Sequence, residues 1–175
     1  MPSTSLTIAA STLLAVTISG AALLTNARET RSADTPRAPQ AIAATPQAIA
    51  ATPQAINKYA EVCQACHQVN GQGMPGAFPP LAGSEWLNGR ADIPIAIALK
   101  GLQGEITVKG TKYNGAMIAW EAVLNDADLA ATLTYARSQW GNRGTPVTAA
   151  QVKAVRTRFA GRTAPWTEAE LKAFR

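Results

Sequence analysis

Cysteine and histidine are scarce in this 175-residue chain, and their scarcity excludes two common architectures. The two Cys and one His are too few for the four ligands of a structural zinc site or for a disulfide-rich scaffold. Charged residues make up 15% and hydrophobic residues 47%, which argues against a fully disordered chain. The formal net charge of +5 is too small to indicate a nucleic-acid-binding protein.

Positive charge is also absent ahead of the apolar run at residues 5–27, SLTIAASTLLAVTISGAALLTNA. This run carries no charge, is long enough to span a bilayer and is long for the apolar part of a secretory signal. Two interpretations therefore stand for residues 1–27, a cleaved signal peptide or an N-terminal membrane anchor. Arg28, Arg31 and Arg37 follow the run, and this charge bias alone would keep the rest of the chain in the cytoplasm.

Residues 28–55 form an Ala-, Pro- and Gln-rich linker with a seven-residue repeat. The repeat places Pro39, Pro46 and Pro53 at equal intervals, and proline inside a helix removes an amide donor and clashes with the preceding turn. A coiled coil is therefore excluded, and an extended spacer is expected. Behind a membrane anchor such a spacer is a tether.

All the cysteine and histidine of the chain lies in one motif, Cys63-Gln64-Ala65-Cys66-His67. C-x-x-C-H is the attachment motif of a c-type haem, in which two thiols add to the two vinyl groups and the adjoining imidazole binds iron. A helical stripe over residues 54–63 leads into the motif, so one turn of helix places the three side chains on one face. A thiol-redox C-x-x-C is the alternative, but that motif normally follows a strand and opens a helix.

Because His67 is the only His, a second axial ligand has to be a different residue type, and methionine is the usual one in electron carriers. Met74 lies only seven residues beyond His67, too close to reach the opposite face of a haem. Met117 lies fifty residues beyond it, and the turn-forming pair Asn114-Gly115 predicts a loop there. Met117 is thus the candidate distal ligand, the alternative being a residue that fills the core.

Three stretches between residues 59 and 142 together resemble the class I monohaem cytochromes c, in particular small bacterial periplasmic electron-transfer subunits. These stretches are VCQACHQVNGQGMPGAFPPLAGSEW, KGLQGEITVKGTKYNGAMIAW and LNDADLAATLTYARSQWGN. The resemblance implies an all-α cytochrome c fold at residues 56–142, wrapped around one covalent haem c.

The resemblance also assigns roles to single residues. Cys63 and Cys66 would be the thioether anchors, His67 the proximal ligand and Met117 the distal ligand of the iron. Pro80 would offer its carbonyl oxygen to the second ring nitrogen of His67 and so orient the imidazole. The family often has proline directly after the distal methionine, whereas this chain has Ile118, which favours a more labile Met117.

The function expected from the motif and the resemblance is one-electron transfer through the Fe(II)/Fe(III) couple, not enzymatic turnover. The expected partners are redox proteins: a periplasmic dehydrogenase, a quinol-linked complex, or a terminal oxidase or reductase, with the chain as a possible subunit of such a complex. Haem attachment places the domain in a bacterial periplasm, either anchored by residues 5–27 or soluble after cleavage. A haem enzyme and a gas-binding sensor with a labile Met117 are the alternatives.

Other elements are expected around this centre. Helices are predicted at residues 92–100 and 126–139, and a small β-hairpin at residues 105–113 around Lys109-Gly110. Residues 143–175 are expected to form a helical extension with two capping boxes. Four basic residues in this extension form either a solvated helix face or a docking patch for an acidic partner: Lys153, Arg156, Arg158 and Arg162.

Overall fold

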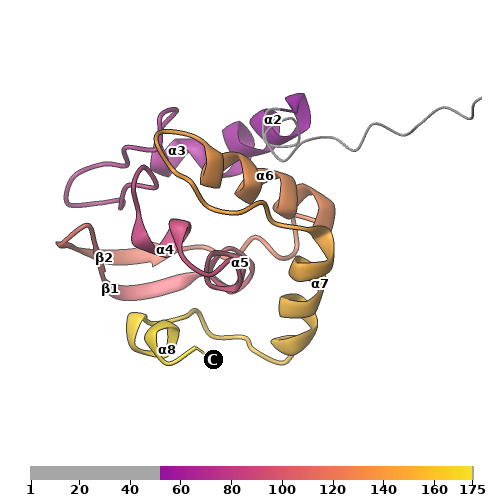
Figure 1. Cartoon of the computed structure of the whole chain (residues 1–175). Coiled ribbons are helices and arrows are strands. Elements are labelled where there is room, and N and C mark those ends of the chain that lie inside the picture. The colour runs from indigo at the N-terminus through magenta and orange to yellow at the C-terminus, as the bar shows by residue number, and fades with distance from the viewer. Residues whose placement is uncertain (1–51, 175) are drawn as a thin grey trace, which may run out of the picture. The chain divides into compact units, whose positions relative to one another are not determined.

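The computed structural model describes residues 52–174, so the predicted signal or anchor and all but the last residues of the predicted linker lie outside the described residues. Its elements follow in the order α2 (Pro53–Val62), α3 (Gln64–His67), α4 (Glu85–Asn88), α5 (Asp92–Lys100), β1 (Leu102–Val108), β2 (Thr111–Met117), α6 (Asp126–Ser138), α7 (Ala149–Arg158) and α8 (Glu168–Lys172) (Figure 1). The described part is thus helical with one two-stranded antiparallel sheet, as predicted. Within it, no helix combines the length and the apolar character needed to cross a membrane.

Helices α2 and α6 pack against each other and form one side of the core (Figure 1). Helix α2 begins at Pro53, so the last three residues of the predicted linker, 53–55, belong to it. The helix starts there because the Thr52 side chain accepts a hydrogen bond from the Ala55 amide and Pro53 occupies the first turn. Aromatic rings meet at this contact. The ring centroid of Tyr59 in α2 lies 5.4 Å from that of Tyr135 in α6 and 5.2 Å from that of Trp140, just after α6. Such ring pairs each stabilise a core by about 0.5–1.5 kcal/mol beyond the burial of their area.

The β-hairpin is longer than the sequence indicates. Its turn lies at Lys109-Gly110, as predicted, with φ values of 53° and 76°. Positive φ at both central residues is the signature of a type I′ two-residue turn, so this pair sets the register. Asn114 and Gly115 consequently lie inside strand β2, opposite Glu105 and Gly104, and do not form a turn. The prediction of a loop at this point was wrong.

Helices α7 and α8 form the C-terminal extension, and both begin with the predicted capping boxes. Helix α7 contacts α5 and α6, and α8 contacts β1 (Figure 1). The segment between them is bonded to the domain through Trp166. Its indole N–H donates to the Ala96 carbonyl at 3.0 Å, its amide donates to the Gly101 carbonyl at 3.0 Å, and its carbonyl accepts from the Gln103 amide at 2.8 Å.

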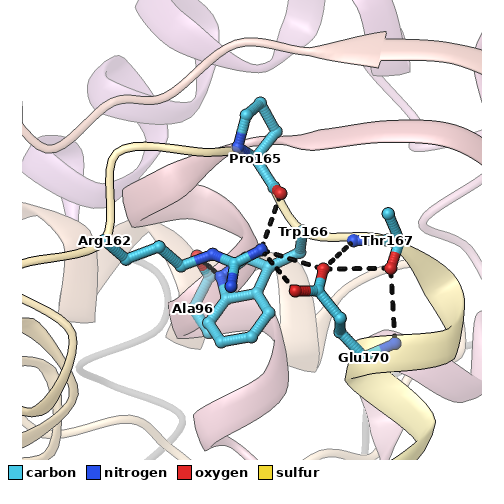
Figure 2. Close-up of polar contacts among 6 residues, drawn as sticks. All are labelled: Ala96, Arg162, Pro165, Trp166, Thr167 and Glu170. Atoms are coloured by element: carbon cyan, nitrogen blue, oxygen red, sulfur yellow. Dashed lines mark hydrogen bonds and ion pairs between the residues drawn. The ribbon is translucent and has the colours of Figure 1, made fainter.

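Two of the four basic residues of the extension, Arg156 and Arg162, do not fit the predicted solvated helix face, whereas Lys153 and Arg158 are exposed. Arg156 pairs with Asp126 at 2.8 Å and Arg162 pairs with Glu170 at 2.8 Å. Arg162 also stacks on Trp166, 3.7 Å from the ring centroid, and donates to the Pro165 carbonyl (Figure 2). Both guanidinium groups are thus engaged within the chain and do not form a free positive surface.

Candidate haem-binding site

A mostly apolar cavity of about 250 Å³ lies among α3, α5, α6 and the hairpin. Both cysteines, His67 and Met117 line it, although they come from two regions of the chain fifty residues apart. Trp86 and Trp120 also line it. The fold therefore gathers around one cavity the four side chains that the sequence singled out for haem binding.

The cysteines lie at the junction of two helices. Cys63 follows the last residue of α2 and precedes α3, and its carbonyl accepts from the His67 amide at 2.9 Å. One turn thus carries both thiols and the imidazole. The cysteines form no disulfide, and Cys66 is exposed while Cys63 is half-buried. The cavity wall therefore reaches the surface at Cys66.

The chemistry of Cys63 does not fit a thiol-redox motif. Burial, and to a lesser degree the nearby Cys66, raises the pKa of the Cys63 thiol to about 12. A redox C-x-x-C needs a thiol with a lowered pKa, because the thiolate is the nucleophile. The motif also follows a helix and not a strand. Attachment of a group through the two sulfurs fits this setting better than disulfide exchange.

His67 is buried, with 7% of its surface exposed, and its ring is held in one orientation. Its Nδ1 lies 2.9 Å from the Pro79 carbonyl oxygen. Since a carbonyl only accepts, Nδ1 carries the proton and donates, and Nε2 keeps its lone pair. Burial lowers the pKa of His67, against the opposing effect of the Pro79 hydrogen bond. The imidazole is therefore neutral near pH 7 and has one nitrogen available to a metal.

The oxygen that orients His67 belongs to Pro79 and not to Pro80, so the prediction of Pro80 was wrong by one residue. The reason lies in the loop after α3. Met74 and Phe78 exchange two backbone hydrogen bonds of 2.8 Å, which closes a tight loop. The next carbonyl after Phe78, that of Pro79, then faces the imidazole. Pro80 still lines the cavity.

Met117 is the last residue of β2, paired with Leu102 of β1, and it is half-buried against the core. Met74, the other methionine in residues 52–174, is 45% exposed and does not line the cavity. The preference for Met117 over Met74 therefore agrees with the cavity lining, although Met117 lies on a strand end and not on the expected loop.

The sequence analysis missed Asn142, which joins the cavity wall to the end of α6. Its side chain, in a residue 5% exposed, accepts from the Gly83 amide at 2.8 Å and from Asn88 Nδ2 at 2.7 Å. It donates to the carbonyls of Leu81 and Ala136 at 3.1 and 2.8 Å. Leu81 lines the cavity, so Asn142 holds part of the wall in place.

Arg137 was also missed, since an arginine on an amphipathic helix is normally exposed. It is 1% exposed and donates to the carbonyls of Leu87, Gly89 and Thr145. These bonds tie the α4 region and the chain after α6 to α6 itself. Burial lowers the pKa of Arg137, but an arginine stays charged in a folded protein. No sequence signal distinguishes it from a surface arginine.

Haem fits the residues that are present. The cavity is mostly apolar, it carries two unpaired thiols at the attachment spacing, and it offers one neutral imidazole and one thioether as metal-binding atoms. Soft sulfur and imidazole ligands suit iron in a c-type haem. The same set is too small for a structural zinc site.

Comparison with known proteins agrees with this geometry. The family model for cytochrome c matches residues 55–140, from α2 to just beyond α6. Two proteins of Thermus thermophilus, both named cytochrome c-552, are 47% identical to this chain over 109 residues. The matched region covers 57% of this chain and 82% and 72% of the two relatives.

The chain therefore belongs to the cytochrome c family. Its cofactor is a covalent haem c, and Cys63 and Cys66 stand at the spacing of the attachment motif. Its function is haem-based electron transfer. Helices α7 and α8 lie beyond the residues that the family model matches.

Proposed function

We propose that this protein is a one-electron carrier whose haem is attached through Cys63 and Cys66 and ligated by His67 and Met117. The observation that carries the proposal is that one cavity is lined by all four of these side chains. The haem, when bound, supplies the Fe(II)/Fe(III) couple that accepts and releases one electron. The protein has to hold both ligands and keep water and substrates away from the metal.

The described residues are suited to this task. The Pro79 carbonyl keeps the His67 proton on Nδ1, so Nε2 remains a ligand. The apolar lining lowers the local dielectric, which disfavours extra positive charge at the metal and raises the reduction potential. Methionine ligation raises it further. Both His67 and Met117 would hold the haem iron, which would leave no ligand position for a substrate, and this favours a carrier over an enzyme.

We also propose that the carrier works in a bacterial periplasm with redox proteins as partners: a dehydrogenase, a quinol-linked complex, or a terminal oxidase or reductase. The exposed position of Cys66 supports electron exchange at this edge of the cavity. Small contact areas suit brief encounters between such proteins. Residues 5–27 would hold the domain to the membrane, or be removed as a signal.

The test is absorption spectroscopy of the protein matured in a periplasm. Pyridine hemochrome analysis should give one c-type haem per chain. The oxidised protein should show the weak near-infrared band of methionine-to-iron ligation. Met117→Ala should abolish this band, whereas the control Met74→Ala should keep it because Met74 does not line the cavity.

Two results would contradict the ligation. The band would be missing from the unaltered protein, or it would survive in Met117→Ala. Rapid binding of CO by the reduced protein would favour a gas sensor or a haem enzyme over a pure carrier. Absence of covalent haem would contradict attachment through Cys63 and Cys66 and would favour the alternative, a thiol-redox motif.

A further inference from the structure

The segment after Met117, residues 118–125, bears directly on how firmly Met117 is held. It begins with Ile118, whose side chain is 64% exposed and so is not held by the core. A turn follows, in which the Trp120 carbonyl accepts from the amides of Val123 and Leu124 at 3.0 and 2.9 Å. Trp120 and Leu124 both line the cavity. The segment therefore needs another source of rigidity.

Arg156 of α7 contacts this segment with two of its guanidinium nitrogens and the residue directly after it with the third. Nη1 donates to the Glu121 carbonyl at 2.9 Å and Nη2 donates to the Leu124 carbonyl at 2.7 Å. Nε donates to the Asp126 carboxylate at 2.8 Å, at the first residue of α6. The side chains of Arg156 and Asp126 are 28% and 29% exposed, so water screens the contacts only in part. One side chain thus spans the turn and the start of the next helix.

Helix α5 holds the same segment by different contacts. The Trp120 amide donates to the Ala98 carbonyl at 2.9 Å. The Glu121 carboxylate lies 2.7 Å from Lys100 Nζ, and the Lys100 side chain is only 5% exposed. Glu121 is therefore bound through its carboxylate by α5 and through its carbonyl by α7. Glu121 lies only four positions after Met117, so a backbone that moves more at Glu121 also lets Met117 move more.

We propose that Arg156 is a positioning residue for Met117, which it holds near the iron by bracing residues 118–125. This inference rests on the proposed function, because it takes Met117 to be the distal ligand. A planar guanidinium with several fixed donors is suited to the role, since charge-assisted bonds to two carbonyls and a carboxylate define one geometry. Helix α7, which lies beyond the residues that the family model matches, thus supplies the hold on this segment that the exposed Ile118 does not.

Arg162 offers a matched control in the same extension. It too donates to a backbone carbonyl, that of Pro165 at 2.7 Å, and to a carboxylate, that of Glu170 at 2.8 Å (Figure 2). These partners, Pro165 and Glu170, lie in the segment that leads into α8 and not in residues 118–125. Arg162→Gln therefore removes similar bonds without touching the segment.

The experiment measures how readily imidazole displaces Met117 from the oxidised holoprotein. Arg156→Gln should raise the apparent imidazole affinity about tenfold, which is about 1.4 kcal/mol, because the open state becomes more populated. Arg156→Lys keeps the charge but reaches fewer acceptors, and should raise it about threefold. Arg162→Gln should stay within about twofold of the unaltered protein. Hydrogen exchange by mass spectrometry should show faster exchange at residues 118–125 in the Arg156 variants alone.

The proposal is overturned if Arg156→Gln and Arg162→Gln give the same imidazole affinity and the same exchange at residues 118–125. If Arg156→Gln does not fold, Arg156→Lys decides, and an affinity equal to that of the unaltered protein is then the contrary result. Failure of the His67/Met117 proposal is seen separately, as a near-infrared band missing from the unaltered protein or unaffected by Met117→Ala.

Discussion

Replacing Gly101 by Ala should displace the Met117 backbone, because a Cβ at this position would meet the Met117 carbonyl oxygen. Gly101 ends α5 with φ 79° and ψ 177°, a conformation essentially restricted to glycine. A Cβ there would lie 2.5 Å from the Met117 carbonyl oxygen, whereas an ordinary contact is 3.4 Å or more. The substitution therefore forces a shift of roughly 0.9 Å between the end of α5 and the end of β2.

The expected cost has two parts. The strained backbone conformation should lower the free energy of unfolding by about 2 kcal/mol once the residue carries a side chain. The forced shift should lower it by about 2 kcal/mol more, as at other overpacked sites. Gly110→Ala is the matched control, because Gly110 has a similar φ of 76° but a Cβ there meets nothing within 4 Å. Gly110→Ala should lower the free energy of unfolding by about 1.5 kcal/mol, from the left-handed backbone conformation alone.

Urea unfolding of the holoprotein, followed by far-ultraviolet circular dichroism, gives both free energies of unfolding. The near-infrared band gives the state of the Met117 ligand in the same samples. Gly101→Ala should lose about 4 kcal/mol and weaken the band, while Gly110→Ala keeps the band. Equal losses in the two variants, with the band unchanged in both, would refute the argument from close approach.

Two further predictions concern parts of the fold that support the site. Asn142→Ala should lower the free energy of unfolding in urea by about 2–4 kcal/mol, because buried groups of other segments lose their partner; a loss below about 1 kcal/mol would contradict this. The pKa of Glu170 lies below 4.5, chiefly because its carboxylate accepts from the Thr167 amide. The ionised Glu170 carboxylate therefore stabilises the folded protein fully above pH 4.5, and this stabilisation is lost as the pH falls through the lowered pKa. The difference in Tm between the unaltered protein and Glu170→Gln should accordingly shrink on acidification, and a difference that stays constant from pH 7 down to about pH 2 would contradict the assignment.

The bracing of residues 118–125 gives the C-terminal extension a place in the chemistry of the site. Helix α7 supplies Arg156, and α7 begins with a capping box in which Thr148 and Gln151 bond each other reciprocally. Such a box fixes where a helix starts, and so where its side chains lie. Loosening this box should therefore act on Met117 in the same direction as a change at Arg156, though more weakly.

Elements with local causes were predictable from the sequence. Helix α6 begins at Asp126 because Asn125 accepts from the Asp128 amide three residues on, a signal contained within one turn. The hairpin turn at Lys109-Gly110 is local in the same sense. The competing Asn114-Gly115 pair misled the prediction because turn propensity does not tell which of two nearby turns the strand pairing will use.

The attachment motif was the strongest local signal of all. Cys63, Cys66 and His67 lie within five consecutive residues, so helix geometry alone places them together, and the chemistry of those residue types then points to haem. Which carbonyl orients the imidazole was decided elsewhere. The sequence offers two adjacent prolines, Pro79 and Pro80, with no signal that tells which carbonyl faces His67. The backbone pairing of Met74 with Phe78 places the Pro79 carbonyl there.

The sequence by itself thus determined the cofactor and its attachment, because covalent chemistry depends on residue type and short spacing. The tertiary structure decided what surrounds them. Arg156 and Glu121 are 35 residues apart, and no local sequence pattern predicts that the Arg156 guanidinium donates to the Glu121 carbonyl. Their contact follows from the packing of α7 against α5 and α6, which depends on surfaces that only the folded chain brings together.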